Sequence, residues 1–387
     1  MVRFSGGLAM RLVDARGRKS LMTVKGLDLA RAFFGDAVRP IVLRHFPSLR
    51  YSAALIGSGS EVLGYDDAVS TDHHWGPRVM LFVAPADQAV TARRLHDALA
   101  AELPYRFMGY STNFSAPKVG AGDQGTQLMQ AISAGPVNHR VEILTLDAYL
   151  RRYLGVAADQ ALTAADWLSL PQQKLLSFTG GDVFHDELGL ETLRDRFRYY
   201  PRDVWLYLLA CGWSRIGQDE HLAPRAGAVG DELGSALIAA RLTRSIMLLC
   251  FLYERRYAPY PKWLGSAFAA LPCAAELAPI LRAVQTGATW RERERQLCAA
   301  YETLNSMHNA SGIGAPVEPA LQEFHERGFL VSSGWRYTES LLAEIDDPEV
   351  KMISEGALIG SVDLFSDSTD LREATALRGK IARLYRG

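Results

Sequence analysis

The sequence AALIGSGSEVLGYDDAVSTDHHWGPRVMLFV, residues 53–83, decides the fold of this chain. It contains most of one largely apolar run, 51–56, and all of a second, 78–83. The length and composition of both runs are typical of buried β-strands. The first run ends at Gly57-Ser58. A strand that ends in a Gly/Ser turn exposes several backbone N–H groups together, and such a turn can bind phosphate. The stretch therefore predicts two strands joined through an anion-binding turn.

Three further residues are candidate ligands for a divalent metal ion. Asp72 and His74 precede the second run and lie two residues apart, so an extended chain points both to the same face. Glu142 is the one acid in a third strand-like run, 139–144, which we expect beside the second strand. An isolated acid among apolar neighbours is unfavourable unless it meets a cation. Metal ligands beside a phosphate-binding turn are what phosphoryl or nucleotidyl transfer needs, because the metal neutralises charge on the transferred group.

These motifs resemble a known superfamily. Gly-Ser after a strand, followed by Asp-x-Asp/Glu on the next strand, is similar to the signature of the polymerase-beta-like nucleotidyltransferases. Within that group the chain resembles a bacterial domain family of unassigned function, close to the kanamycin nucleotidyltransferases. The matching segments are Gly57-Ser58, DHHWGPR at 72–78, DELGS at 231–235 and ERRYAPYPKW at 254–263. The chain departs from the pattern at His74, where the family would have Asp.

The resemblance implies an α+β fold. A small, mixed-sheet nucleotidyltransferase-like domain would span residues 1–155 and a larger helical domain residues 156–387, with the active cleft between them. The periodicity after residue 155 is also almost wholly helical, punctuated by prolines.

The resemblance also implies an enzymatic function. The chain would transfer a nucleoside monophosphate from an NTP, with ATP among the candidates, to a hydroxyl of a small-molecule acceptor. Mg²⁺ or Mn²⁺ would be bound by Asp72, Glu142 and His74, although an imidazole suits Mn²⁺ better than Mg²⁺. Gly57 and Ser58 would hold the phosphates, and Glu142 would also act as the base for the acceptor hydroxyl.

Three cations in the helical part are candidates for a phosphate clamp. Arg241 and Arg244 lie three residues apart on one face of the apolar helix expected over 227–256, and two buried cations need anions. Lys262 follows the rigid, aromatic turn 257–261. The anions that meet the arginines are either nucleotide phosphates or acids of the chain itself, namely Asp231, Glu232 or Glu254. Asp363 is a further candidate for the wall of the cleft.

Residues around the second strand are open to more than one interpretation. Arg78 could reach phosphate or form an ion pair with an acid of its own chain. Trp75 is expected to pack in the core, because it points away from His74 on a regular strand. Asp66 and Asp67 are more typical of a turn than of a metal site.

Composition places limits on the partners and the location. The 387 residues carry a formal net charge of −1, so the chain has no bulk attraction for nucleic acid or for an anionic membrane. The N-terminus lacks the long apolar core of a signal peptide, and the apolar run 246–252 is too short to span a bilayer. The four cysteines show no C-x-x-C spacing, which favours reduced thiols in a cytoplasm.

Two other classes of function fit the same residues. The chain could be a nucleotide- or metabolite-binding protein that kept the fold and lost catalysis, because His74 replaces an acid. It could also act on a sugar or nucleoside with Asp72 and Glu142 as acid and base. Metal-dependent release of pyrophosphate separates the transferase from both alternatives.

Overall fold

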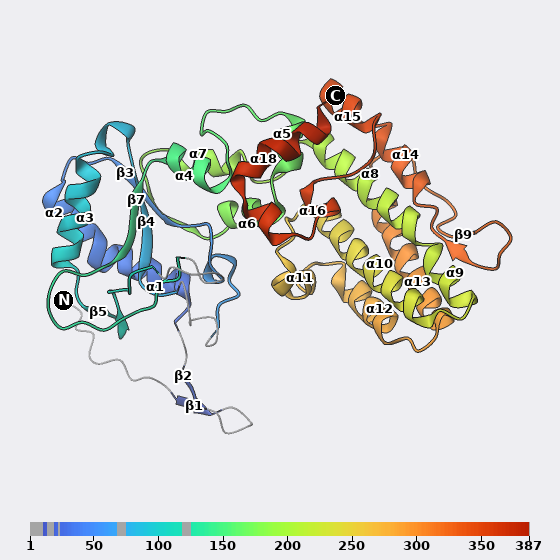
Figure 1. The fold of residues 1–387 in the computed structure, drawn as a ribbon, viewed down its shortest axis with the longest axis horizontal. Coiled ribbons are helices and arrows are strands. Elements are labelled where there is room, and N and C mark those ends of the chain that lie inside the picture. Colours follow the sequence, from blue (N-terminus) through green and yellow to red (C-terminus); the bar gives the residue numbers. More distant parts are fainter. Residues whose placement is uncertain (1–10, 14–18, 22–23, 68–74, 118–124, 387) are drawn as a thin grey trace. The chain divides into compact units, whose positions relative to one another are not determined.

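The computed structural model describes residues 11–13, 19–21, 24–67, 75–117 and 125–386. The chain divides into two compact units (Figure 1). Unit 1 comprises residues 1–153 and 177–196, and unit 2 comprises residues 154–176 and 197–387. Unit 1 contains the larger sheet and unit 2 is mainly helical, which confirms the α+β class.

A four-stranded mixed sheet forms the centre of unit 1, with the strand order β7-β4-β3-β8. β3 is antiparallel to β4, and β4 is parallel to β7. The register places Met80 of β4 opposite Glu142 of β7. The three strands expected from the sequence are therefore present, and Glu142 lies beside the second of them as predicted. Their bounds are β3 Tyr51–Leu55, β4 Arg78–Val83 and β7 Arg140–Leu144.

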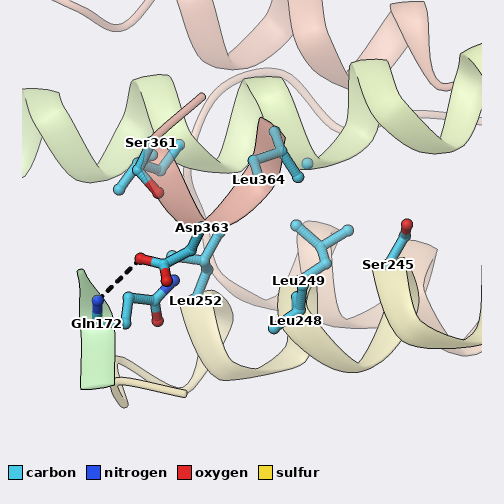
Figure 2. A pocket seen from close by; sticks show the side chains of 10 residues that line it. Gln172, Ser245, Leu248, Leu249, Leu252, Ser361, Asp363 and Leu364 are labelled. Atoms are coloured by element: carbon cyan, nitrogen blue, oxygen red, sulfur yellow. Dashed lines mark hydrogen bonds between the residues drawn. The ribbon is translucent and has the colours of Figure 1, made fainter. Parts of the chain in front are cut away.

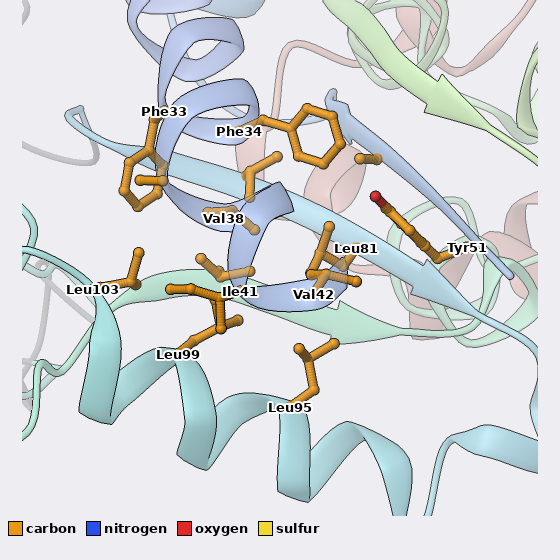
Figure 3. Close-up of a cluster of buried hydrophobic side chains, with 14 of the residues drawn as sticks. Phe33, Phe34, Val38, Ile41, Val42, Tyr51, Leu81, Leu95, Leu99 and Leu103 are labelled. Carbon is orange, nitrogen blue, oxygen red and sulfur yellow. The ribbon is translucent and has the colours of Figure 1, made fainter. Parts of the chain in front are cut away.

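Helices cover one face of this sheet. α1 (Gly26–Phe33), a π-helical segment (Phe34–Val38), α2 (Arg39–His45) and α3 (Thr91–Glu102) enclose one apolar core with the strands (Figure 3). The strand period of two sends Val79, Leu81 and Val141 into this core. Arg78, Met80 and Glu142, at the alternate positions, therefore face the other side of the sheet. Short strands pair as hairpins elsewhere in unit 1: β1 Arg11–Val13 with β2 Lys19–Leu21, and β5 Arg106–Phe107 with β6 Tyr110–Ser111.

The fourth strand, β8 (Asp182–Asp186), comes from a later part of the chain and pairs with β3. The expectation of an almost wholly helical chain after residue 155 was wrong here. Asp186 ends the strand and accepts the N–H groups of Gly189 and Leu190 at 2.9 and 3.0 Å, so it leads directly into α7 (Leu190–Asp195). The strand has two aspartates and a histidine among its five residues, so its composition does not give the apolar run by which the other strands were recognised.

Unit 2 packs its helices around α8 (Arg202–Asp219) and α10 (Glu232–Tyr253). The helix expected over 227–256 is divided, because Asp231 caps α10 by accepting the N–H of Gly234 at 2.7 Å. The other helices are α4 Leu146–Tyr153 in unit 1, α6 Gln172–Thr179 across the unit boundary, and, in unit 2, α5 Ala164–Ser169, α9 Leu222–Ala228, α11 Pro261–Phe268, α12 Ala274–Thr286, α13 Trp290–Ala310, α14 Trp335–Leu342, α15 Pro348–Ser354, α16 Val362–Phe365, α17 Thr369–Glu373 and α18 Thr375–Ala382. β9 (Gln322–Glu323) and β10 (Leu330–Val331) form a small hairpin.

α10 is longer than the apolar run noted in the sequence. By length and composition alone it could cross a membrane, and within the described ranges it is the one helix that could. However, 56% of its most apolar window is buried inside the protein, as in the core helix of a soluble domain. Its two arginines each form an ion pair with an acid of unit 2, which also fits a core helix.

Candidate functional site

The Gly57-Ser58 turn follows β3 and requires glycine at its first position. Gly57 has φ +84°, and a Cβ atom there would lie 2.6 Å from the Tyr149 hydroxyl, so a side chain would both strain the backbone and clash. The Gly57 N–H already donates to the Ser177 carbonyl at 2.9 Å. Among the described residues, the N–H and hydroxyl of Ser58 have no hydrogen-bond partner. Ser58 is therefore the better candidate for an anion donor at this turn.

Arg78 forms a buried ion pair, which decides between its two interpretations. Its Nη2 and Nε atoms lie 2.6 and 2.9 Å from Oε1 of Glu61, and the two side chains are only 10% and 2% exposed. Nη2 also donates to the Ser58 carbonyl at 2.7 Å. Arg78 thus stabilises the turn through the backbone carbonyl of Ser58, and its charge is paired with Glu61 within the protein.

The described residues on either side of 68–74 have defined contacts. Trp75 is buried and packs edge-to-face on Tyr110 with 4.9 Å between ring centroids, which confirms its core role. Asp66 accepts the Gly26 N–H at 2.7 Å and the Trp75 Nε1–H at 3.3 Å, so it caps α1. The predicted ligands Asp72 and His74 lie outside the described residues.

Glu142 has the cation partner that the sequence led us to expect. Nη2 of Arg152, on α4, lies 2.8 Å from Oε2 of Glu142, and the two side chains are 61% and 40% exposed. Sequence reasoning did not identify Arg152. The available signal was the short connection from β7 to α4, because a helix that starts directly after a strand returns over that strand's end.

The chemistry of Glu142 fits one position in a divalent metal site. A carboxylate supplies the oxygen ligands that Mg²⁺ and Mn²⁺ take, and this one already faces a positive charge. Within the described part of the chain, no group of three or more His, Cys, Asp or Glu residues is placed to hold a metal ion. Any remaining ligands would have to come from outside the described ranges, where Asp72 and His74 lie.

Charged side chains gather on this side of the sheet among the described residues. Burial, and then the guanidinium of Arg78, lower the pKa of Arg140, while Glu142 and Glu61 act on that pKa in the opposite direction. Together with Arg152, this cluster contains three guanidinium groups and two carboxylates. We call these five residues the arginine cluster. A guanidinium group can bind an anion such as phosphate in a bidentate manner.

In unit 2 the predicted clamp arginines have partners other than those expected. Nη2 of Arg241 lies 2.6 Å from Oδ1 of Asp219, and Nη2 of Arg244 lies 2.7 Å from Oδ1 of Asp367. The expectation that both cations are buried was wrong, because their side chains are 48% and 33% exposed. The acids expected as partners serve other groups: Asp231 caps α10, Glu232 pairs with Arg293, and Glu254 accepts the Cys273 N–H.

Lys262 lies in the first turn of α11 and is exposed. Its Nζ atom is 4.7 Å from the centroid of the Trp263 ring, a cation–π distance. The contact holds the ammonium group on the protein surface.

Two variants separate a scaffold role from a clamp role in unit 2. Arg241→Ala leaves the carboxylate of Asp219, which is 7% exposed, with only the longer contact to Arg215 at 3.8 Å. We expect it to lower the free energy of unfolding by about 1–3 kcal/mol. Lys262→Ala should change it by less than about 0.5 kcal/mol, because that side chain is exposed. Urea unfolding measures both changes. Equal stability losses in the two variants would contradict the scaffold role of Arg241.

A small pocket lies between α8, α10 and α16 of unit 2 (Figure 2). Oδ2 of Asp363 accepts the N–H of Gln172 at 2.8 Å at its edge. Burial raises the pKa of Asp363, although that hydrogen bond and Arg372 oppose the shift. The volume of about 30 Å³ has room for about two water molecules, so a nucleotide base does not fit. Its apolar wall is made by Leu208, Leu248, Leu249, Leu252 and Leu364.

Comparisons with known proteins give two similarities. A family model described as a domain of unknown function (DUF4037) matches residues 167–264, a range that includes parts of both units. No curated protein matches the chain. A crystal structure of a nucleotidyltransferase-like protein from Exiguobacterium sibiricum 255-15 aligns with 71% of this chain and 76% of that chain, at 12% sequence identity and a TM-score of 0.29.

Neither similarity identifies a substrate, a metal ion or a site residue for this chain. A domain family of unassigned function is what the motifs resembled, and the family model that matches has that description. Closeness to the kanamycin nucleotidyltransferases stays a prediction. A TM-score of 0.29 does not establish a shared fold, so the hypothesis of nucleotidyl transfer rests on this chain's own residues.

Proposed function

We propose that this chain is a metal-dependent nucleotidyltransferase that moves a nucleoside monophosphate from an NTP to a hydroxyl of a small-molecule acceptor. The observation that carries the proposal concerns the sheet of unit 1. The Gly57-Ser58 turn follows β3, and Glu142 lies on β7, with β4 between these two strands. The arginine cluster, to which Glu142 belongs, also contains Arg78, which donates to the Ser58 carbonyl of the turn. A tight turn with free donors, a carboxylate and guanidinium groups are the components of phosphate chemistry.

The residues take the following roles in the proposal. The N–H and hydroxyl of Ser58 bind a phosphate oxygen, and Gly57 keeps the backbone in the shape that presents them. Glu142 accepts the proton of the attacking hydroxyl. A bound Mg²⁺ or Mn²⁺ would neutralise phosphate charge, with Asp72, His74 and Glu142 as its ligands.

Three cations of unit 2 are also proposed to bind phosphate. Arg241 is 48% exposed, Arg244 is 33% exposed and Lys262 is exposed, so an anion can reach all three. Among the described residues, Arg244 is held by its ion pair with Asp367, which is itself 76% exposed. We also place the protein in the cytoplasm, since all four of its cysteines are free.

The decisive experiment tests metal-linked nucleotide binding and then catalysis. Melting temperature is measured with each NTP, with and without Mg²⁺ or Mn²⁺, because a ligand that binds only the folded state raises apparent stability. Pyrophosphate release is then measured with the NTP that binds. Binding without release would favour a nucleotide-binding protein, and no metal-linked binding of any NTP would refute the proposal.

The choice of metal gives a sharper prediction, because His74 replaces an acid of the motif. An imidazole supplies nitrogen and no negative charge, so Mn²⁺ should support nucleotide binding better than Mg²⁺. His74→Asp should then raise Mg²⁺-supported binding by about tenfold, the effect of roughly one added charge interaction. Titration calorimetry with both metals measures this. His74→Asn serves as the control, and equal effects of the two variants would show that charge at this position is unimportant.

A further inference from the structure

We propose that Arg152 is a phosphate-binding residue whose guanidinium pairs with Glu142 until Glu142 takes the divalent cation, and then turns to the phosphate chain. This inference rests on the proposed function above. It adds a residue that lies outside the motif and that the sequence did not indicate. Arg152 is suited to this role by its place on α4 and by its exposed ion pair with Glu142.

The face of α4 that carries Arg152 borders the Gly57 turn. Tyr149, Arg152 and Tyr153 lie three and four residues apart and so share one side of the helix. A Cβ atom at Gly57 would lie 2.6 Å from the Tyr149 hydroxyl and 3.8 Å from the Tyr153 ring. The guanidinium of Arg152 reaches Glu142 from this same side.

The environment of Tyr149 places all these groups close together. Burial raises the pKa of its hydroxyl most strongly, Glu142 adds to the rise, and Arg152 opposes it. The hydroxyl is buried beside the Gly57 turn and has no hydrogen-bond partner within the described part of the chain. The Gly57-Ser58 turn, Glu142 and Arg152 therefore all lie near the Tyr149 hydroxyl in unit 1.

The ion pair of Arg152 with Glu142 is suited to exchange. Both side chains are largely in solvent, at 61% and 40% exposure, and ion pairs of this kind contribute little to stability. Arg78 in the same cluster is different, because it and Glu61 are almost completely buried. Arg152 is thus the guanidinium that can leave its carboxylate at low cost and bind phosphate in a bidentate manner.

The plain alternative is that Arg152 forms only a surface ion pair, and the chain offers a matched control. Arg151, one residue earlier on α4, pairs with Asp147 at 2.7 Å and is 63% exposed. A helix turns by about 100° per residue, so Arg151 points away from the face that borders the turn. Both arginines lie on α4, carry the same charge and pair with a carboxylate, but their side chains leave the helix in different directions.

The test compares Arg152→Gln with Arg151→Gln in the full chain by titration calorimetry. The ligands are Mn²⁺ alone, and then inorganic tripolyphosphate in the presence of Mn²⁺. We expect Arg152→Gln to bind Mn²⁺ alone about threefold more tightly or better, because Glu142 has lost a competing cation. We expect it to bind tripolyphosphate about tenfold more weakly, because a charge-assisted donor is gone. Arg151→Gln should change neither affinity.

Opposite changes in the two affinities are the signature of this role, since removing an arginine that only pairs with Glu142 would strengthen Mn²⁺ binding but would not weaken tripolyphosphate binding. Arg152→Lys keeps the charge and should restore part of the tripolyphosphate affinity. If the wild type binds tripolyphosphate with Mn²⁺ and Arg152→Gln behaves like Arg151→Gln, the role of Arg152 is overturned while the proposed function stands. If the wild type shows no Mn²⁺-linked tripolyphosphate binding, both fail.

Discussion

Replacing Glu142 with glutamine is expected to lower turnover by about 10²–10⁴-fold, the usual effect of losing a general base, with a much smaller change in nucleotide affinity. The substitution keeps the size of the side chain and can still accept a hydrogen bond from Arg152. The register of β7 on β4 would be unaffected, because Glu142 is half-exposed and does not belong to the apolar core. Single-turnover release of pyrophosphate, with binding measured separately, gives both quantities.

Asp147→Asn is the matched control for this variant. Asp147 is also a partly exposed acid that pairs with an arginine of α4, and it should leave turnover unchanged. If Glu142→Gln retained the wild-type turnover, Glu142 would be only the ion-pair partner of Arg152. A loss of affinity as large as the loss of turnover would instead indicate that Glu142 acts in binding, through the metal.

Arg78→Ala is expected to lower the free energy of unfolding by about 3–5 kcal/mol, because it leaves the carboxylate of Glu61 buried without its cation. The same change removes the hydrogen bond to the Ser58 carbonyl, so phosphate binding at the turn should weaken as well. Urea unfolding monitored by circular dichroism measures the stability.

Two further variants make this prediction specific. Replacing both Glu61 and Arg78 by methionine removes the two charges together and should recover most of the lost stability. Arg151→Ala breaks an exposed ion pair and should change stability by less than about 1 kcal/mol. A loss below about 1 kcal/mol in Arg78→Ala would mean that the Glu61 pair does not stabilise unit 1.

The strands of unit 1 were predictable because their information is local. The run 79–83 is apolar throughout, and the run 139–144 has one acid among apolar neighbours, so the two were expected as neighbouring strands. β8 was not predictable in this way. Asp182–Asp186 has two aspartates and a histidine in five residues, and it becomes a strand because β3 offers it an edge to pair with.

The identity of each partner at the candidate site was also beyond the sequence. Arg244 pairs with an acid 123 residues away, and the Gly57 N–H is bound by the carbonyl of Ser177. The sequence shows that Arg78 needs an anion, but not that Glu61 supplies it. Such choices are made by the tertiary fold, so residue type and spacing predicted the strands beside the turn better than they predicted the hydrogen bonds of the turn.

The origin of β8 has a consequence for how the protein is made. A ribosome adds residues from the N-terminus, so β3, β4 and β7 emerge well before Asp182–Asp186. Until then β3 is an edge strand, whose unpaired N–H and C=O groups invite pairing with other chains. Residues 154–176, which belong to unit 2, must also leave the ribosome before unit 1 can complete its sheet. The nascent chain therefore passes through a stage in which its first unit is incomplete and open to misassembly, and during which early chaperone contact would protect β3.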